Sequence, residues 1–473
     1  MRNSDMKNTK SDVIIVGSGV AGLYCALHLP ASMNVTIITK ADKEESDSFL
    51  AQGGICVLKD EKDYEAYFED TMRAGHYENN RESVDIMISS SRDVIRDLLT
   101  YGVDFQRDGY GNLCFTREGA HSSPRILYHE DITGREITGR LLDEVRRAPN
   151  IRLCDHVTMV DIIIGNTPIR HCRGVVAISS EAPGQDEDGD GIALSDGRRI
   201  FSLEAPEVVW ACGGIGGLYE KSTNYSHLTG DALGIALRHK IRLKDLDYMQ
   251  IHPTTLYTEK KERAFLISES VRGEGGILLN DRACRFVDEL QPRDVVTKAI
   301  FAEMDRTGAK HVWLSMAEIP DESIRTHFRN IYETCLKEGY DCTKEAVPVA
   351  PAQHYYMGGV WADCDSRTSL PQLYAIGETS CNGVHGMNRL ASNSLLESLV
   401  FAKRAAHAIV GEFDHVMYDP MESACMDFSV YEEPDKIFEV YRENILKAIE
   451  RNKRYREQCH NASEGRQIDS ASA

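Results

Sequence analysis

The sequence lacks three features that would direct the protein to membranes, nucleic acids or the cell exterior. No run approaches the roughly 20 apolar residues of a transmembrane helix. Lys and Arg number 54 against 74 Asp and Glu, and the net charge of −20 excludes the basic surface that nucleic acids and anionic membranes require. The 13 cysteines include no C-x-x-C pair, which favours reduced thiols in a cytoplasmic protein.

The first residues imitate a signal peptide without completing the pattern. A polar stretch carrying Lys and Arg precedes an apolar one that starts at Val13. Glycines at 17, 19 and 22 interrupt the apolar stretch, and no cleavage site of small residues follows it. We therefore expect no cleaved leader. The length of 473 residues predicts about three domains and a large hydrophobic core.

A β-α-β unit is predicted at the N-terminus. Residues 13–16 form a β-branched run typical of a strand buried on both faces. Residues 20–29 have helical spacing with Pro30 just beyond, and residues 35–38 predict a second strand. Such a unit is the start of a parallel, Rossmann-like α/β sheet.

The turn between the first strand and the helix fits G-x-G-x-x-G. The first glycine makes the turn, the second admits a pyrophosphate to the backbone, and the third lets the helix pack on the strand. The position after the second strand, where an acidic residue usually binds the adenosine ribose, is Lys40, so the ribose contact is left open. The motif comprises Gly17, Ser18, Gly19, Val20, Ala21 and Gly22.

Three further segments favour FAD over NAD. The stretch Ala51, Gln52, Gly53 and Gly54 is small enough for a flavin edge to lie against backbone. Glu378, after a late strand at 373–376, offers a carboxylate to ribitol hydroxyls. Ser394 and Leu395 lie near the start of a helix over 392–410, with Ser392 as its expected cap. The positive helix end would stabilise an anionic reduced flavin.

The rest of the chain is mixed in character. Strands are predicted over 151–164, 173–179 and 207–212, and an acidic loop over 181–191 imitates the start of a calcium loop. Because Gly197 stands where that loop needs Glu, we interpret it as a solvated turn. Residues 226–337 are expected to form an inserted α/β segment. Apolar residues four apart from Ile437 to Ile449 predict one amphipathic C-terminal helix.

An ordered series of motifs resembles the fumarate reductase/succinate dehydrogenase flavoprotein family over residues 11 to about 410. The motifs that carry the resemblance, in chain order, are G-S-G-V-A-G at 17–22, A-Q-G-G at 51–54, A-C-G-G at 211–214, T-G-D at 229–231, H-P-T at 252–254, R-G-E-G at 272–275, P-R-D at 292–294, H-Y-Y-M-G-G at 354–359 and A-I-G-E at 375–378.

Two stretches make the chain resemble the aspartate-oxidising members of this family most. Ser46, Asp47 and Ser48 stand where respiratory members carry the histidine that bonds FAD, so the resemblance implies non-covalent FAD. Residues 116–122, T-R-E-G-A-H-S, resemble a segment of the aspartate-oxidising members. The implied activity is oxidation of L-aspartate to iminoaspartate, with oxygen or fumarate as acceptor, in quinolinate and NAD synthesis. Quinolinate synthase is the implied consumer of the product.

The resemblance also implies a domain plan. A Rossmann-like FAD-binding domain at 11–225 and 338–410 would be interrupted by an α+β capping domain at 226–337. Residues 411–473 would form a helical segment shorter than the family's usual C-terminal bundle.

The resemblance implies roles for single residues. Arg293 would transfer a proton at the substrate β-carbon while hydride leaves the α-carbon, and Glu118 would orient the amino group. As an Arg stays protonated, a base role needs a relay or a neighbouring charge. The alternatives are a surface Arg, a solvated loop Glu and, for Arg389, a structural ion pair. The implied substrate-binding residues are His252, His354, Arg389, Ser268 and Glu269, and Lys40, Asp47, Ser48 and Asp231 join the cofactor-binding set.

Two other functions fit parts of the sequence. The first is a soluble fumarate reductase acting on succinate and fumarate. The second is a flavin-binding module without catalysis, which the presence of Arg293, Arg389, His252 and His354 disfavours.

Overall fold

The computed structural model describes residues 11–166, 168–179, 191–413, 416 and 427–471. The acidic loop expected at 181–191, which resembles the start of a calcium loop, lies outside the described residues except for residue 191. No described helix has the length and apolar character needed to cross a bilayer.

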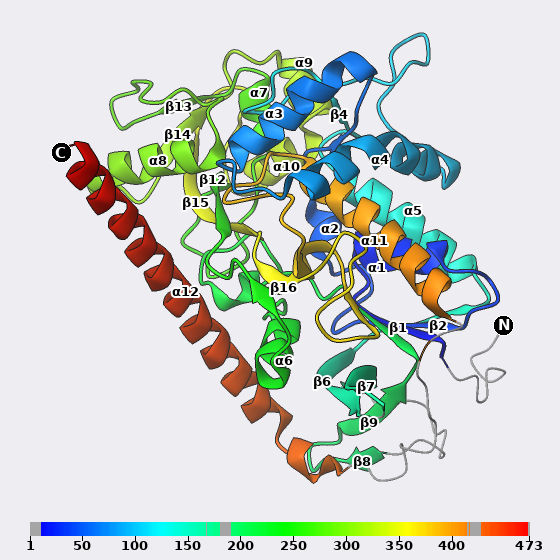
Figure 1. Ribbon diagram of the computed structural model, residues 1–473. Helices are drawn as coiled ribbons and strands as arrows, with labels where there is room; N and C mark the ends of the chain where they lie inside the picture. The colour runs from blue at the N-terminus through cyan, green and yellow to red at the C-terminus, as the bar shows by residue number, and fades with distance from the viewer. Residues whose placement is uncertain (1–10, 167, 180–190, 414–415, 417–426, 472–473) are drawn as a thin grey trace.

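A five-stranded parallel sheet forms the centre of the molecule, in the order β17-β10-β1-β2-β5 (Figure 1). Alternate residues of β1 explain the two layers that cover it. Ile15 belongs to a core shared with helices α1, α4, α5 and α11, whereas Ile14 and Val16 belong to a core shared with α6 and an antiparallel sheet. The bounds are β1 Val13–Val16, β2 Val35–Ile38, β5 Ile151–Cys154, β10 Glu207–Trp210, β17 Leu373–Ala375, α1 Val20–His28, α4 Arg81–Thr100, α5 Thr133–Arg147, α6 Asp231–His239 and α11 Asn393–Glu412.

The strand expected over 151–164 is wrong as a single element. It divides into β5, in the parallel sheet, and β6, in the antiparallel sheet of order β6-β7-β9-β8. His156 has a φ of +57° between them, and this left-handed residue turns the chain from one sheet into the other. The bounds are β6 Val157–Gly165, β7 His171–Ser179, β8 Gly191–Ala193 and β9 Arg199–Glu204.

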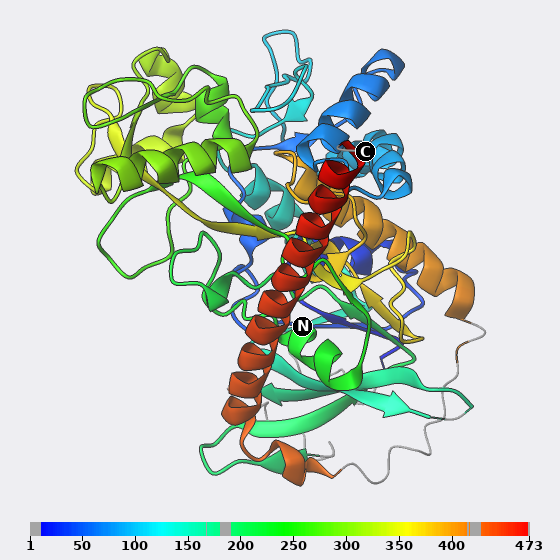
Figure 2. The same cartoon turned by 60° about the vertical axis from the view of Figure 1, so that its left-hand side comes forward.

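A third sheet, in the order β12-β15-β14-β13, lies above the parallel sheet and has a core of its own that runs from Leu256 to Val349 (Figures 1 and 2). Helix α6 packs instead with the parallel sheet. The bounds are β12 Met249–Leu256, β13 Ile277–Leu279, β14 Val312–Ser315, β15 Val347–Tyr356, α7 Glu269–Gly273, α8 Arg293–Thr307, α9 Asp321–Thr326 and α10 Arg329–Lys337.

Residues Pro434–Ala471 form one long helix, α12, which follows a short 3-10 helix at Phe428–Tyr431 and crosses the outside of the molecule past α6 (Figure 2). Tyr441 and Ile445, two of the residues expected on its apolar face, are buried in the core that includes α6. The remaining elements are α2 Asp47–Leu50, β3 Ile55–Cys56, α3 Tyr64–Ala74, β4 Ile126–Leu127, β11 Leu243–Lys244, β16 Gly359–Trp361 and β18 Ser380–Cys381.

Candidate active site

One continuous pocket starts at the carboxyl ends of the parallel strands, where open α/β sheets bind their ligands, and runs to the sheet of order β12-β15-β14-β13. The structure brings nearly all the predicted site residues to its wall, from Gly17 to Leu395. Gly22 alone lies behind the wall. A Cβ there would stand 2.1 Å from the Gly17 carbonyl oxygen, so this glycine serves the close packing of α1 on β1.

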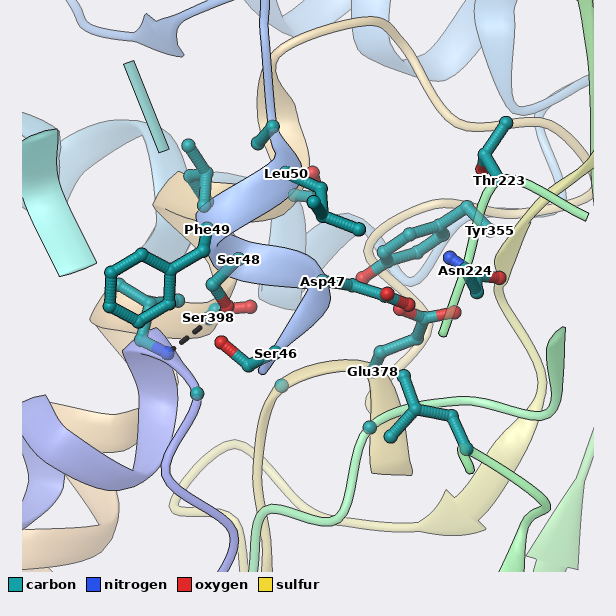
Figure 3. A pocket seen from close by; sticks show the side chains of 18 of the residues that line it. Ser46, Asp47, Ser48, Phe49, Leu50, Thr223, Asn224, Tyr355, Glu378 and Ser398 are labelled. Carbon is teal, nitrogen blue, oxygen red and sulfur yellow. Dashed lines mark hydrogen bonds between the residues drawn. The ribbon is translucent and has the colours of Figure 1, made fainter. Parts of the chain in front are cut away.

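The glycine turn leaves a cradle for a phosphate group. Gly17 has a φ of +120°, and a Cβ on it would stand 2.0 Å from the Ala211 carbonyl oxygen. Gly19 occupies the N-cap position of α1 and supplies no capping side chain, and this helix end lines the pocket, where backbone amides suit an anion. The Val20 amide donates to Ser48 Oγ at 3.1 Å, which fixes α2 against the turn (Figure 3).

Lys40, which stands where an acidic residue was expected after the second strand, pairs with a carboxylate from another part of the chain. Its Nζ donates to Asp231 Oδ2 at 2.8 Å and to Thr229 Oγ1 at 3.0 Å. Asp231 is the first residue of α6, 191 positions further on. The carboxylate that pairs with Lys40 therefore comes from a distant element, which strand spacing alone could not reveal.

Two half-buried carboxyl groups, Asp47 and Glu378, point towards the same part of the pocket (Figure 3). Glu378 accepts from the Tyr356 amide at 2.9 Å and Asp47 from the Tyr225 amide at 3.0 Å. Burial raises the pKa of Asp47 to about 7; burial and the charge of Asp47 raise the pKa of Glu378 to about 8. Asp47 Oδ2 has no protein partner. This pair of carboxyl groups can hydrogen-bond hydroxyl groups and fits the hydroxyl-rich ribityl chain of FAD.

Arg293 begins α8 and is buried, so it is no surface residue. Its Nε donates to Glu269 Oε2 at 2.5 Å, and its Nη1 donates to Gln250 Oε1 at 2.8 Å. Arg272 Nη2 lies 3.3 Å from the same Glu269 oxygen. Burial opposes ionisation of Glu269, but the two guanidinium groups outweigh it and lower its pKa.

Sequence reasoning assigned no role to Arg272 or Gln250, although Arg272 lies in one of the quoted motifs. Arg293, Glu269 and Arg272 form a continuous chain of buried ion pairs. Ser268 caps α7 by accepting from the Ser270 amide at 3.2 Å, which holds Glu269 in place.

His252 and His354 meet edge to face, with ring centroids 5.1 Å apart. Burial, then the charge of Arg293, holds the pKa of both rings well below the ordinary value, so both are neutral. His252 Nδ1 accepts from the Thr254 amide at 3.2 Å, which places its proton on the unpartnered Nε2. Nε2 is therefore a donor available to a ligand.

Arg389 carries its charge without a carboxylate partner within the described ranges. Its Nη1 donates to Ser394 Oγ at 2.8 Å, its guanidinium lies 4.4 Å from the Tyr355 ring centroid, and its Nε has no partner. The ion-pair alternative is therefore wrong. A buried, unpaired guanidinium is a strong binding group for a carboxylate.

Glu118 is 3% exposed, so the solvated-loop alternative is wrong. Its Oε1 accepts from Ser270 Oγ at 2.8 Å and its Oε2 accepts from Ser392 Oγ at 2.6 Å. Burial and the charge of Glu269 raise its pKa. The expected capping role of Ser392 is also wrong: the residue has a φ of +61°, and its hydroxyl bonds Glu118 instead of the helix end.

Comparisons with known proteins agree with this pocket. The FAD binding domain model matches residues 12–395. L-aspartate oxidase of Clostridium perfringens is 46% identical over 422 residues, covering 89% of this chain and 91% of the relative, and that of Clostridium acetobutylicum is 44% identical, covering 85% and 88%. E. coli quinol fumarate reductase FrdA superposes with a TM-score of 0.76 at 27% identity, covering 94% of this chain and 74% of that one.

Proposed function

Since the chain belongs to the L-aspartate oxidase family of FAD-binding flavoproteins, we propose that it oxidises L-aspartate to iminoaspartate with non-covalently bound FAD. Oxygen or fumarate is the electron acceptor, and the product feeds quinolinate and NAD synthesis in the cytoplasm. Hand-over of iminoaspartate to quinolinate synthase belongs to the same proposal. The FAD-binding and capping domains inferred from the sequence belong to the same proposal, with α6 now counted in the FAD-binding domain and β15 in the capping domain.

The proposal depends mainly on one observation: Glu118 lines the same pocket as the cationic side chains Arg293 and Arg389. Arg389, Arg293 and the neutral rings of His252 and His354 offer donors to the two carboxylates of a C4 acid. Glu118 offers a carboxylate that has no ion-pair partner among the described residues, and such a group suits an ammonium. Succinate has no group for Glu118, and an additional carboxylate would be repelled by it.

The bound FAD supplies a hydride acceptor for the substrate α-carbon. Arg389 and His252 bind the substrate carboxylates and fix the α-carbon relative to the ring. Arg293 takes the β-carbon proton, and Glu269 accepts the proton that Arg293 must release before it acts as a base. Replacing both hydrogens by a double bond gives the enamine tautomer of iminoaspartate, so the atoms balance.

Anaerobic titration of the holoenzyme tests the substrate. We expect L-aspartate to bleach the flavin absorbance while succinate leaves it unchanged. Bleaching by succinate alone would favour the rival function, a soluble fumarate reductase. Reoxidation by oxygen and by fumarate, followed in the same cuvette, identifies the faster acceptor.

Replacing Arg293 with Leu tests the proton route. We expect FAD to stay bound and turnover to fall by about 10²–10⁴, the usual contribution of a positioned acid or base. Arg306→Leu, at the exposed end of the same helix, is the matched control. Full activity in the Arg293 variant would contradict the assignment.

A further inference from the structure

The C-terminal helix α12 packs against two elements that wall the nucleotide end of the pocket. Tyr441 lies so close to α6 that a Cβ on Gly234 would stand 2.4 Å from the Tyr441 Cβ. Its hydroxyl donates to the Val160 carbonyl oxygen of β6 at 3.1 Å. Residues 157–159 of β6 and 229–231 at the start of α6 line the pocket itself.

Lys40 is the contact through which α12 reaches the pocket. Its ammonium group lies 5.3 Å from the centroid of the Phe438 ring, at cation–π distance. The same ammonium holds Asp231 and Thr229 at the pocket wall. Phe438 itself is half-buried and is not part of that wall. Phe438 can therefore affect a ligand through Lys40, besides its packing against the cores that include β6 and α6.

We propose that α12 is a positioning element for the adenosine half of FAD, and that Phe438 fixes Lys40, which in turn fixes Asp231. The proposal rests on FAD binding in this pocket and is independent of the substrate. Its physical basis is the entropy of a lysine side chain: an ammonium confined by a ring on one side and a carboxylate on the other is already ordered before FAD binds.

Release of FAD from the full-length holoenzyme tests the proposal. The dissociation constant is obtained from the rise in free flavin fluorescence on serial dilution. We expect Phe438→Ala to weaken FAD binding about three- to tenfold, the range of a half-exposed cation–π contact, while kcat at saturating FAD is unchanged. Phe438→Leu keeps an apolar contact and should lose most of the same affinity, so it carries the test if the Ala variant does not fold.

The control is Val440→Ala, on the same helix but 54% exposed, which should bind FAD as the wild type does.

A double-mutant cycle separates positioning from a general loss of packing. In a Lys40→Met background, Phe438→Ala should cause no further loss of affinity, because the group it acts on is gone. Wild-type affinity in both Phe438 variants, or an equal loss in the Lys40→Met background, would overturn the proposal.

Discussion

At the residue scale, Glu118 is the side chain that we propose selects among C4 acids. Both oxygens of Glu118 accept hydroxyl hydrogen bonds, at 2.8 and 2.6 Å. The backbone of Gly53 packs against the carboxylate, and only glycine fits there, because a Cβ would stand 2.5 Å from Oε1. The carboxylate is thus held in one position before substrate arrives. A fixed carboxylate favours an ammonium group more than a mobile one does.

We predict that Glu118→Gln lowers kcat/KM for aspartate about 10- to 100-fold, the loss of one charge-assisted hydrogen bond, and changes fumarate reduction less than threefold. The amide keeps the shape of the side chain, so folding and FAD content serve as controls. Steady-state assays with both substrates measure the ratio. Equal losses with the two substrates would contradict the role.

The raised pKa of Glu378 leads us to expect that the stability of the FAD-free protein depends on pH. Burial raises the pKa of this carboxyl to about 8 from an ordinary 4.5, so the folded chain holds a proton that the unfolded chain has released. Stability therefore falls as pH rises from about 4.5 to about 8 and levels off above. Urea unfolding at pH 6 and pH 8.5 should differ by an amount on the order of 1 kcal/mol or more, and Glu378→Gln should reduce the difference. A steeper dependence in the variant would refute this account.

At the element scale, the turn between β1 and α1 depends on a glycine. We predict that Gly17→Ala abolishes FAD binding or folding, because the added methyl would meet the Ala211 carbonyl oxygen at 2.0 Å on a backbone of φ +120°. Gly109→Ala, where a Cβ meets nothing within 4 Å, should bind FAD normally. Flavin content of the purified variants is the measurement, and a Gly17→Ala protein with full flavin would show that the turn can move.

Elements with a strong local pattern were predictable. The β-branched run at 13–16 forms β1, and the segment whose apolar residues recur every four positions from Ile437 to Ile449 lies in α12. The break at His156 was missed although the polar pair Asp155 and His156 interrupts the apolar run, and the left-handed backbone at His156 separates two sheets. Ser392 had the residue type of a helix cap, but Glu118, distant in sequence, takes its hydroxyl.

At the scale of the whole molecule, the net charge of −20 opposes the entry of a dianion. The field of exposed charges is screened by salt, whereas the buried Arg293 and Arg389 are screened much less. We predict that kcat/KM for fumarate rises about two- to threefold between 10 and 100 mM salt. Aspartate, with one net negative charge, should respond less, and a fall in kcat/KM for fumarate would show that exposed cations guide its entry.

The sequence by itself determined the parallel α/β sheet, the glycine turn and the residue types of the site, because each depends on a short local pattern. The tertiary structure decided how those residues act. It placed Asp231 on Lys40, Ser392 on Glu118, and Arg272 and Glu269 behind Arg293. These partners are separated by up to hundreds of residues, and their pKa values and hydrogen bonds follow from burial, which no local pattern encodes.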